Sequence, residues 1–165
     1  MIVIIDYGLS NLRSVGFKLK RYSEEIVISN SKQDILDASK LILAGVGHFG
    51  KAINNLKELD LLSILDAKVI EEKTPILGIC LGMQLFTEFS EEGKSKGLGW
   101  IKGKTRKFNF KPLGINLPIP HVGWNTVEKK KDHLIFENIE TRDFYFTHSF
   151  FVDCDNEDDV LTYSK

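Results

Sequence analysis

The chain has 165 residues, of which 42% are hydrophobic and 27% are charged, and its formal net charge is −1. These values are ordinary for a globular protein, and the length suits one domain, over residues 1–165, with a proper core. The small net charge gives no reason to expect a nucleic-acid or membrane partner, and no stretch approaches the roughly 18 apolar residues of a membrane span.

The chain contains two cysteines, Cys80 and Cys154. Two cysteines cannot form a disulfide framework, and no C-x-x-C spacing suggests zinc, so we expect neither a metal nor a cofactor. This cysteine usage is typical of a reducing, cytoplasmic compartment. Cys154 lies among acidic residues, which would raise its thiol pKa, so we do not expect it to be reactive.

Strand and helix signals alternate four times along the first half of the chain. Continuous apolar runs predict strands at residues 2–5, 25–29, 40–44 and 75–77. Ser10 or Asn11 can cap a helix that carries Leu12, Val15 and Leu19 on one face.

Two further helices are predicted between these strands. Ser31 and Asp34 are spaced as a capping box at the start of a short helix, and a helical stretch runs from Phe49 to Glu72 with a break near Asp60. This alternation predicts an α/β fold: an open, mostly parallel sheet with helices on both faces.

The second half of the chain differs from the first in composition and in its predicted secondary structure. A polar, glycine-rich segment covers residues 91–99, and three β-rich segments follow at 100–110, 122–127 and 144–152. Open α/β sheets place their sites at the carboxyl ends of the strands. The segment Gly45-Val46-Gly47 and Cys80 both lie at such ends, so we expect them to face each other.

Cys80 stands between two glycines in Gly78-Ile79-Cys80-Leu81-Gly82. This is the G-x-nucleophile-x-G pattern of a nucleophile elbow, a strained strand-to-helix turn that exposes a reactive side chain. We expect a strand to enter the turn and a helix over residues 83–89 to leave it, with the dipole of that helix favouring a thiolate. The alternative is a buried core cysteine after a strand.

A thiolate nucleophile needs donors for the oxyanion that forms during attack. The backbone N–H of Leu81 is one natural donor, and Gly45-Val46-Gly47 can supply another if it is more than an ordinary turn. A base is also needed, and His148, in an apolar strand, is the best candidate among the histidines from its position alone. A satisfied core histidine is an equally good interpretation of His148. We expect His133 to be a surface or helix-start residue.

Five motifs occur in order: Asp6-Tyr7-Gly8, Gly45-Val46-Gly47, residues 78–84, Pro120-His121-Val122-Gly123-Trp124-Asn125 and Tyr145-Phe146-Thr147-His148-Ser149. With them the chain resembles the class I (triad) glutamine amidotransferases, and in particular the glutaminase subunits of imidazole glycerol phosphate synthases. The resemblance covers essentially all 165 residues.

The resemblance implies that Cys80 attacks the side-chain amide of glutamine, forms a glutamyl thioester and releases ammonia. It assigns the oxyanion hole to Val46, Gly47 and Leu81. It assigns substrate binding to Gly45, Gln84, His148 and Ser149, so that His148 is a binder rather than the base. The implied partner is a (β/α)₈ cyclase subunit of a heterodimer, which uses the ammonia in histidine biosynthesis.

The chain departs from the family pattern in two places. Ala44 stands where the family usually has proline, and the sequence ends at Lys165 before a His-Pro-Glu segment that carries the base and its orienting acid. We therefore expect a C-terminally incomplete, inactive glutaminase or a non-catalytic binding or regulatory subunit. A further alternative is a paralogous subunit that supplies ammonia for amination of surface-polysaccharide sugars.

Overall fold

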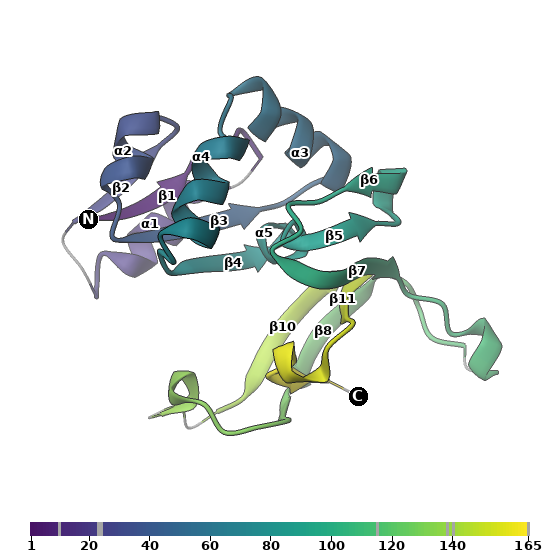
Figure 1. Cartoon of the computed structure of the whole chain (residues 1–165). Coiled ribbons are helices and arrows are strands. Elements are labelled where there is room, and N and C mark those ends of the chain that lie inside the picture. Colours follow the sequence, from purple (N-terminus) through teal and green to yellow (C-terminus); the bar gives the residue numbers. More distant parts are fainter. Residues whose placement is uncertain (10, 23–24, 115, 138, 140, 165) are drawn as a thin grey trace.

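The computed structural model describes residues 1–9, 11–22, 25–114, 116–137, 139 and 141–164. Figure 1 shows an α/β layer formed by the first half of the chain, with the β-rich second half extending from one side of it. The elements of the first half are β1 (Ile2–Ile5), α1 (Leu12–Leu19), β2 (Ile26–Ser29), α2 (Lys32–Asp37), β3 (Lys40–Gly45), α3 (Phe49–Glu58), α4 (Leu62–Asp66), a π-helical turn (Ala67–Glu71), β4 (Ile76–Cys80) and α5 (Leu81–Gln84).

The second half consists mainly of strands. They are β5 (Thr87–Ser90), β6 (Ser95–Lys96), β7 (Ile101–Lys107), β8 (His121–Thr126), β9 (Glu128–Lys129), β10 (Asp143–His148), β11 (Phe150–Cys154) and β12 (Thr162–Tyr163), with single 3₁₀ turns at Glu92–Lys94, Lys111–Leu113, Leu134–Phe136 and Glu157–Asp159. The three predicted β-rich segments are confirmed, and the last of them is divided at Ser149 into β10 and β11.

The first four strands form one parallel sheet in the order β2-β1-β3-β4. Alternate side chains of its central strands enter different cores. Val3 and Leu43 pack with residues of α2, α3 and α4, whereas Ile4 and Ile42 pack with Leu12 of α1. Helices therefore cover both faces (Figure 1), and the predicted doubly wound α/β layer is confirmed.

Local capping signals place the helix starts. Asn11 is the N-cap of α1 and accepts a hydrogen bond from the backbone N–H of Ser14; Ser10, the other candidate, lies outside the described residues. Ser31 caps α2 by accepting from the N–H of Asp34. The predicted break in the long helical stretch is also confirmed, since Asp60 has a φ of +53° between α3 and α4.

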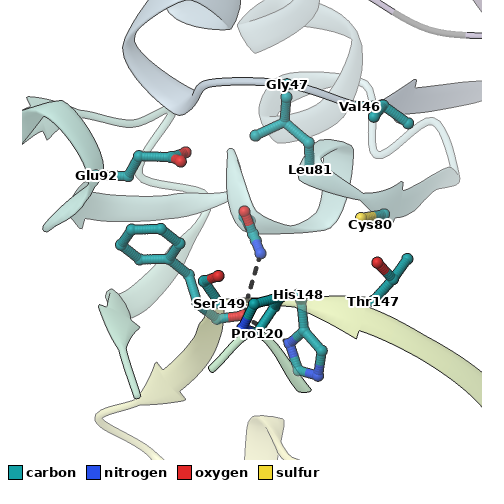
Figure 2. A pocket seen from close by; sticks show the side chains of 11 residues that line it. Val46, Gly47, Cys80, Leu81, Glu92, Pro120, Thr147, His148 and Ser149 are labelled. Atoms are coloured by element: carbon teal, nitrogen blue, oxygen red, sulfur yellow. Dashed lines mark hydrogen bonds between the residues drawn. The ribbon is translucent and has the colours of Figure 1, made fainter. Parts of the chain in front are cut away.

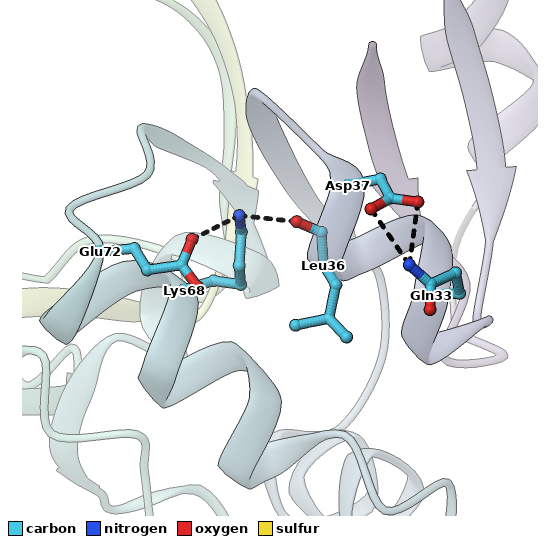
Figure 3. Close-up of polar contacts among 5 residues, drawn as sticks. All are labelled: Gln33, Leu36, Asp37, Lys68 and Glu72. Carbon is cyan, nitrogen blue, oxygen red and sulfur yellow. Dashed lines mark hydrogen bonds and ion pairs between the residues drawn. The ribbon is translucent and has the colours of Figure 1, made fainter.

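A buried lysine joins α2 to the π-helical turn. Lys68 is 4% exposed, and its ammonium group donates to the Leu36 carbonyl at 2.9 Å and to Glu72 at 2.7 Å (Figure 3). Leu36 lies in the last turn of α2, where carbonyls lack intrahelical donors and the helix dipole favours a cation. Lys68 thus reaches from the π-helical turn and donates a hydrogen bond to a carbonyl at the C-terminal end of α2. On the surface of α2, Gln33 donates to Asp37.

The predicted helix over residues 83–89 is wrong. The structure ends α5 at Gln84 and begins β5 at Thr87. The hydroxyls of Thr87 and Thr105 donate to the Gln84 carbonyl at 2.9 and 3.2 Å, so two side chains take the acceptor at the helix end. β5 then joins the second half in a sheet of order β11-β7-β5-β6, while β8 pairs with β10 and β9 with β12. No helix in the described part of the chain is long and apolar enough to cross a bilayer.

Candidate active site

Cys80 lies at the junction of β4 and α5 with a φ of +53° and a ψ of −116°. A non-glycine residue in this region costs on the order of 1–3 kcal/mol, which is the strain expected of a nucleophile elbow. The flanking glycines permit the tight turn, because an added Cβ would lie 2.6 Å from the Met83 Cα at Gly78 and 1.7 Å from the Leu43 carbonyl oxygen at Gly82. Cys80 is exposed, so the buried-core interpretation is wrong.

A cavity of about 280 Å³ opens beside Cys80. Its lining comes from both halves of the chain: Val46, Gly47, Cys80, Leu81 and Gln84 from the first, and Glu92, Pro120, Thr147, His148, Ser149 and Phe150 from the second. Figure 2 shows Cys80 on one side of this cavity and Thr147 and His148 across it on β10, with the His148 ring turned away from Cys80. The two predicted strand ends therefore meet, and Gly45 pairs directly with Cys80 across β3 and β4.

The predicted oxyanion donors differ in their present partners. The backbone N–H of Val46 donates to the Leu9 carbonyl at 2.8 Å, so it is occupied in this conformation. Leu81 begins α5, where the first N–H groups of a helix have no intrahelical acceptor. Gly47 lines the cavity beside these two residues. The geometry is thus compatible with Leu81 and Gly47 as donors at Cys80.

The four histidines all have hydrogen-bond partners. His48 and His133 cap helical segments by accepting from the N–H groups of Gly50 and Ile135, as expected for His133. His148 contacts the Phe150 carbonyl through Nδ1 at 2.8 Å and His121 through Nε2 at 3.1 Å. Both ring nitrogens of His148 are engaged in these contacts, and none of the hydrogen bonds among the described residues joins its ring to Cys80.

Two polar side chains at the floor of the cavity are fixed by backbone groups. Gln84 is 8% exposed, and its amide nitrogen donates to the Phe150 carbonyl at 3.3 Å (Figure 2). The carboxylate of Glu92 accepts a 2.7 Å hydrogen bond from the N–H of Phe49, the first residue of α3. Sequence reasoning missed Glu92, because no local pattern marks it within the polar segment 91–99.

The second cysteine lies away from this cavity. Cys154 is half-buried at the end of β11, and burial, together with the charges of Asp159, Asp153 and Asp155, raises the pKa of its thiol. Its expected low reactivity therefore has two physical causes. Among the described residues no group of three or more histidine, cysteine, aspartate or glutamate side chains could hold a metal ion.

Comparison with known proteins gives three concordant results. The family model "Glutamine amidotransferase class-I" matches residues 3–165. Imidazole glycerol phosphate synthase subunit HisH 2 of Methanococcus maripaludis is 47% identical, with 98% of this chain and 79% of that protein aligned. Subunit HisH of Leptospira borgpetersenii is 40% identical, with the same two shares aligned. In fold, a crystal structure of a glutamine amidotransferase superposes with a TM-score of 0.74 at 16% identity, covering 98% of this chain and 79% of that one.

Proposed function

The chain belongs to the class-I glutamine amidotransferase family, and we propose that it is the glutaminase subunit of an imidazole glycerol phosphate synthase, acting in histidine biosynthesis. The observation that carries the proposal is the exposed, strained Cys80 at the mouth of a cavity lined from both halves of the chain. The similarity to synthase subunits over 98% of the chain supports the same assignment.

In the proposed reaction the Cys80 thiolate attacks the side-chain amide carbon of glutamine. A C–S bond forms and the C–N bond breaks, and the leaving nitrogen receives the proton that a general base has taken from the Cys80 thiol, so ammonia departs and a glutamyl thioester remains. Water then hydrolyses this thioester and releases glutamate and the thiol. The N–H of Leu81, with Gly47 beside it, holds the oxyanion that develops on the former amide oxygen. Val46 joins them only if its N–H exchanges the Leu9 carbonyl for the oxyanion.

Recognition of the amino-acid end of glutamine falls to the opposite side of the cavity. Ser149 and His148 line this side, and Gln84 reaches it from α5 through its hydrogen bond to the Phe150 carbonyl. Gly45 lies on the Cys80 side, where it pairs with Cys80 and supports the strand end that faces the substrate. Glu92 supplies the one carboxylate among the described lining residues, and a carboxylate is suited to pair with the α-ammonium group of an amino acid.

The ammonia is passed to a synthase partner. We propose a (β/α)₈ cyclase subunit in a cytoplasmic heterodimer, on the strength of the relatives' names and the family resemblance. We expect no metal or cofactor in this reaction, because a thiol nucleophile, a general base, an oxyanion hole and water suffice for amide hydrolysis.

The test is Cys80→Ser in the natural protein, in complex with its synthase subunit. Serine is similar in size but a much weaker nucleophile, so glutamine-dependent synthesis should fall at least ~10³-fold. Complex formation and synthesis fed with free ammonia should persist, because the ammonia-consuming step belongs to the partner. Near-normal glutamine-dependent activity in the variant would refute Cys80 as the nucleophile.

A further inference from the structure

Two histidines from neighbouring strands contact each other beside the cavity. His121 begins β8 and His148 ends β10, and the two are paired across the antiparallel ladder. His121 Nδ1 lies 3.1 Å from His148 Nε2, and His148 Nδ1 lies 2.8 Å from the Phe150 carbonyl oxygen. His148 lines the cavity, whereas His121 is not among its lining residues.

The partners fix the position of each proton. A carbonyl oxygen can only accept, so His148 Nδ1 must carry a hydrogen. In neutral His148 the Nε2 atom is then an acceptor, and His121 Nδ1 must be its donor. Both rings are therefore in the Nδ1–H tautomer, and His148 has no ring nitrogen left to offer a ligand.

The same carbonyl is held from the other half of the chain. Gln84, on α5, donates its amide to the Phe150 oxygen at 3.3 Å, so two side chains occupy this acceptor. Aromatic neighbours restrict rotation of both rings. The His121 ring stacks on Phe146 with 5.0 Å between ring centroids, and the His148 ring meets Phe108 edge-on with 5.1 Å between centroids. The line of contacts thus runs from β8 through β10 to α5.

We propose that His121 is a positioning residue for substrate recognition. It holds the His148 ring in one orientation, and that ring, together with Gln84, fixes the main chain of residues 147–150. The segment then presents its backbone groups and Ser149 to the α-amino and α-carboxylate groups of an amino-acid substrate. This inference rests on the proposed glutaminase function for the identity of the substrate, but the arrangement of protons does not depend on it.

The proton arrangement is tested by long-range ¹H–¹⁵N spectra of the ¹⁵N-histidine-labelled full chain at pH 8. We expect His121 and His148 to show the Nδ1–H tautomer, with the signals assigned from their loss in His121→Asn and His148→Asn. A proton on Nε2 of neutral His148 would overturn the inference, whatever the protein's activity.

The positioning role is tested by the rate at which Cys80 reacts with two electrophiles in the complex with the synthase subunit. One is a glutamine-mimicking electrophile that carries the amino-acid head group, and the other is iodoacetamide, which lacks it. His121→Phe keeps the ring on Phe146 but removes Nδ1, and His121→Asn keeps an N–H donor near that position. His133→Phe serves as the control, because His133 caps a distant 3₁₀ turn.

In His121→Phe, the concentration of the glutamine mimic that gives half-maximal labelling should rise about three- to tenfold, the effect of one net hydrogen bond. The maximal rate and the iodoacetamide rate should not change, and His121→Asn and His133→Phe should resemble the wild type. An unchanged half-maximal concentration, or an equal slowing with both reagents, would overturn the role. If the wild type reacts with iodoacetamide but shows no saturable labelling by the mimic, the proposed function fails, while the spectra still decide the proton arrangement.

Discussion

The hydroxyl of Tyr7 lies directly against Gly45, the residue that pairs with Cys80 in the neighbouring strand. A Cβ added to Gly45 would be 1.9 Å from the Tyr7 hydroxyl oxygen and 3.2 Å from the Leu81 Cβ. Tyr7 is 1% exposed, and its hydroxyl has no hydrogen-bond partner among the described residues. A buried hydroxyl without a hydrogen-bond partner among the described residues therefore packs against Gly45, at the end of β3 beside Cys80.

Gly45→Ala should destabilise the protein by about 1–3 kcal/mol, because the added methyl overpacks the contact with Tyr7. Tyr7→Phe alone should be neutral or stabilising, since it removes a buried hydroxyl that has no partner. The double variant should recover at least half of the loss, because only the milder contacts of 3.2 Å, to the Tyr7 ring carbon and to the Leu81 Cβ, remain. Urea unfolding measures the free energy of unfolding of all three variants. If Gly45→Ala costs as much stability in the Tyr7→Phe protein as in the wild type, the clash with the Tyr7 hydroxyl is refuted.

Stability at high pH should also depend on Tyr7. Burial, and then the charge of a nearby Cys80 thiolate, raise the pKa of the Tyr7 phenol above its ordinary value. The unfolded chain loses this proton above pH ~10 while the folded chain keeps it, so the unfolded state binds fewer protons and the free energy of unfolding falls as pH rises. Between pH 10 and 11 the wild type should lose about 1 kcal/mol more than Tyr7→Phe, because the unfolded phenol is already half ionised at pH 10. Parallel pH profiles for the two proteins would contradict this.

Glu92 and Glu91 offer a matched pair for substrate recognition. Each carboxylate accepts a hydrogen bond from a backbone N–H, that of Phe49 for Glu92 and that of Lys107 for Glu91, but only Glu92 lines the cavity. Glu92→Gln should raise the KM for glutamine about tenfold or more through loss of an ion pair with the α-ammonium group. Glu91→Gln should leave it unchanged. Steady-state kinetics of the complex compare the two, and equal effects would argue against a substrate contact.

The two cysteines should differ in their reaction with iodoacetamide. The raised pKa of Cys154 leaves less thiolate at neutral pH, so Cys80 should be labelled first at pH 7.5. Labelling of Cys154 should increase at higher pH, and Asp159→Asn should speed it by removing one of the neighbouring charges. Peptide mapping by mass spectrometry gives both rates. Faster labelling of Cys154 than of Cys80 would contradict the assignment of both thiols.

Within the Lys68–Glu72 ion pair, replacing the buried lysine should cost more stability than replacing the exposed glutamate. The side chain of Lys68 is 5% exposed and that of Glu72 is 51% exposed. Lys68→Met should cost about 1–3 kcal/mol, because it leaves the Leu36 carbonyl without its donor. Glu72→Gln should cost less than about 1 kcal/mol, since the partner faces solvent. Thermal or urea unfolding distinguishes them, and a larger loss in Glu72→Gln would reverse this interpretation.

The first half of the chain was predictable because its signals are local. The apolar run at residues 2–5, the caps Asn11 and Ser31 and the break at Asp60 each lie within a few residues of the structure that they determine. The elbow at Cys80 is local in the same sense, since two glycines and one cysteine within five residues specify it.

The remaining features depend on residues far apart in the sequence. The end of α5 requires Thr105, which lies 21 residues after Gln84, to reach its carbonyl. Glu92 reaches the cavity while hydrogen-bonded to Phe49, 43 residues earlier. The apolar strand around His148 indicated a core or catalytic histidine, but nothing near it indicated that His121 would lie opposite. Such partners become visible only when the strands are paired.

The lining of the cavity has one further consequence, for how such a protein diverges. The reactive thiol and its strand end come from residues 46–84, whereas the opposite wall comes largely from residues 120–150. Because these stretches are separate in the gene, a single recombination event between them can exchange the opposite wall of the cavity while the thiol keeps its own strained turn. The junction to preserve is the Gln84 to Phe150 hydrogen bond, so a chimera of two relatives should retain both of its partners as a matched pair.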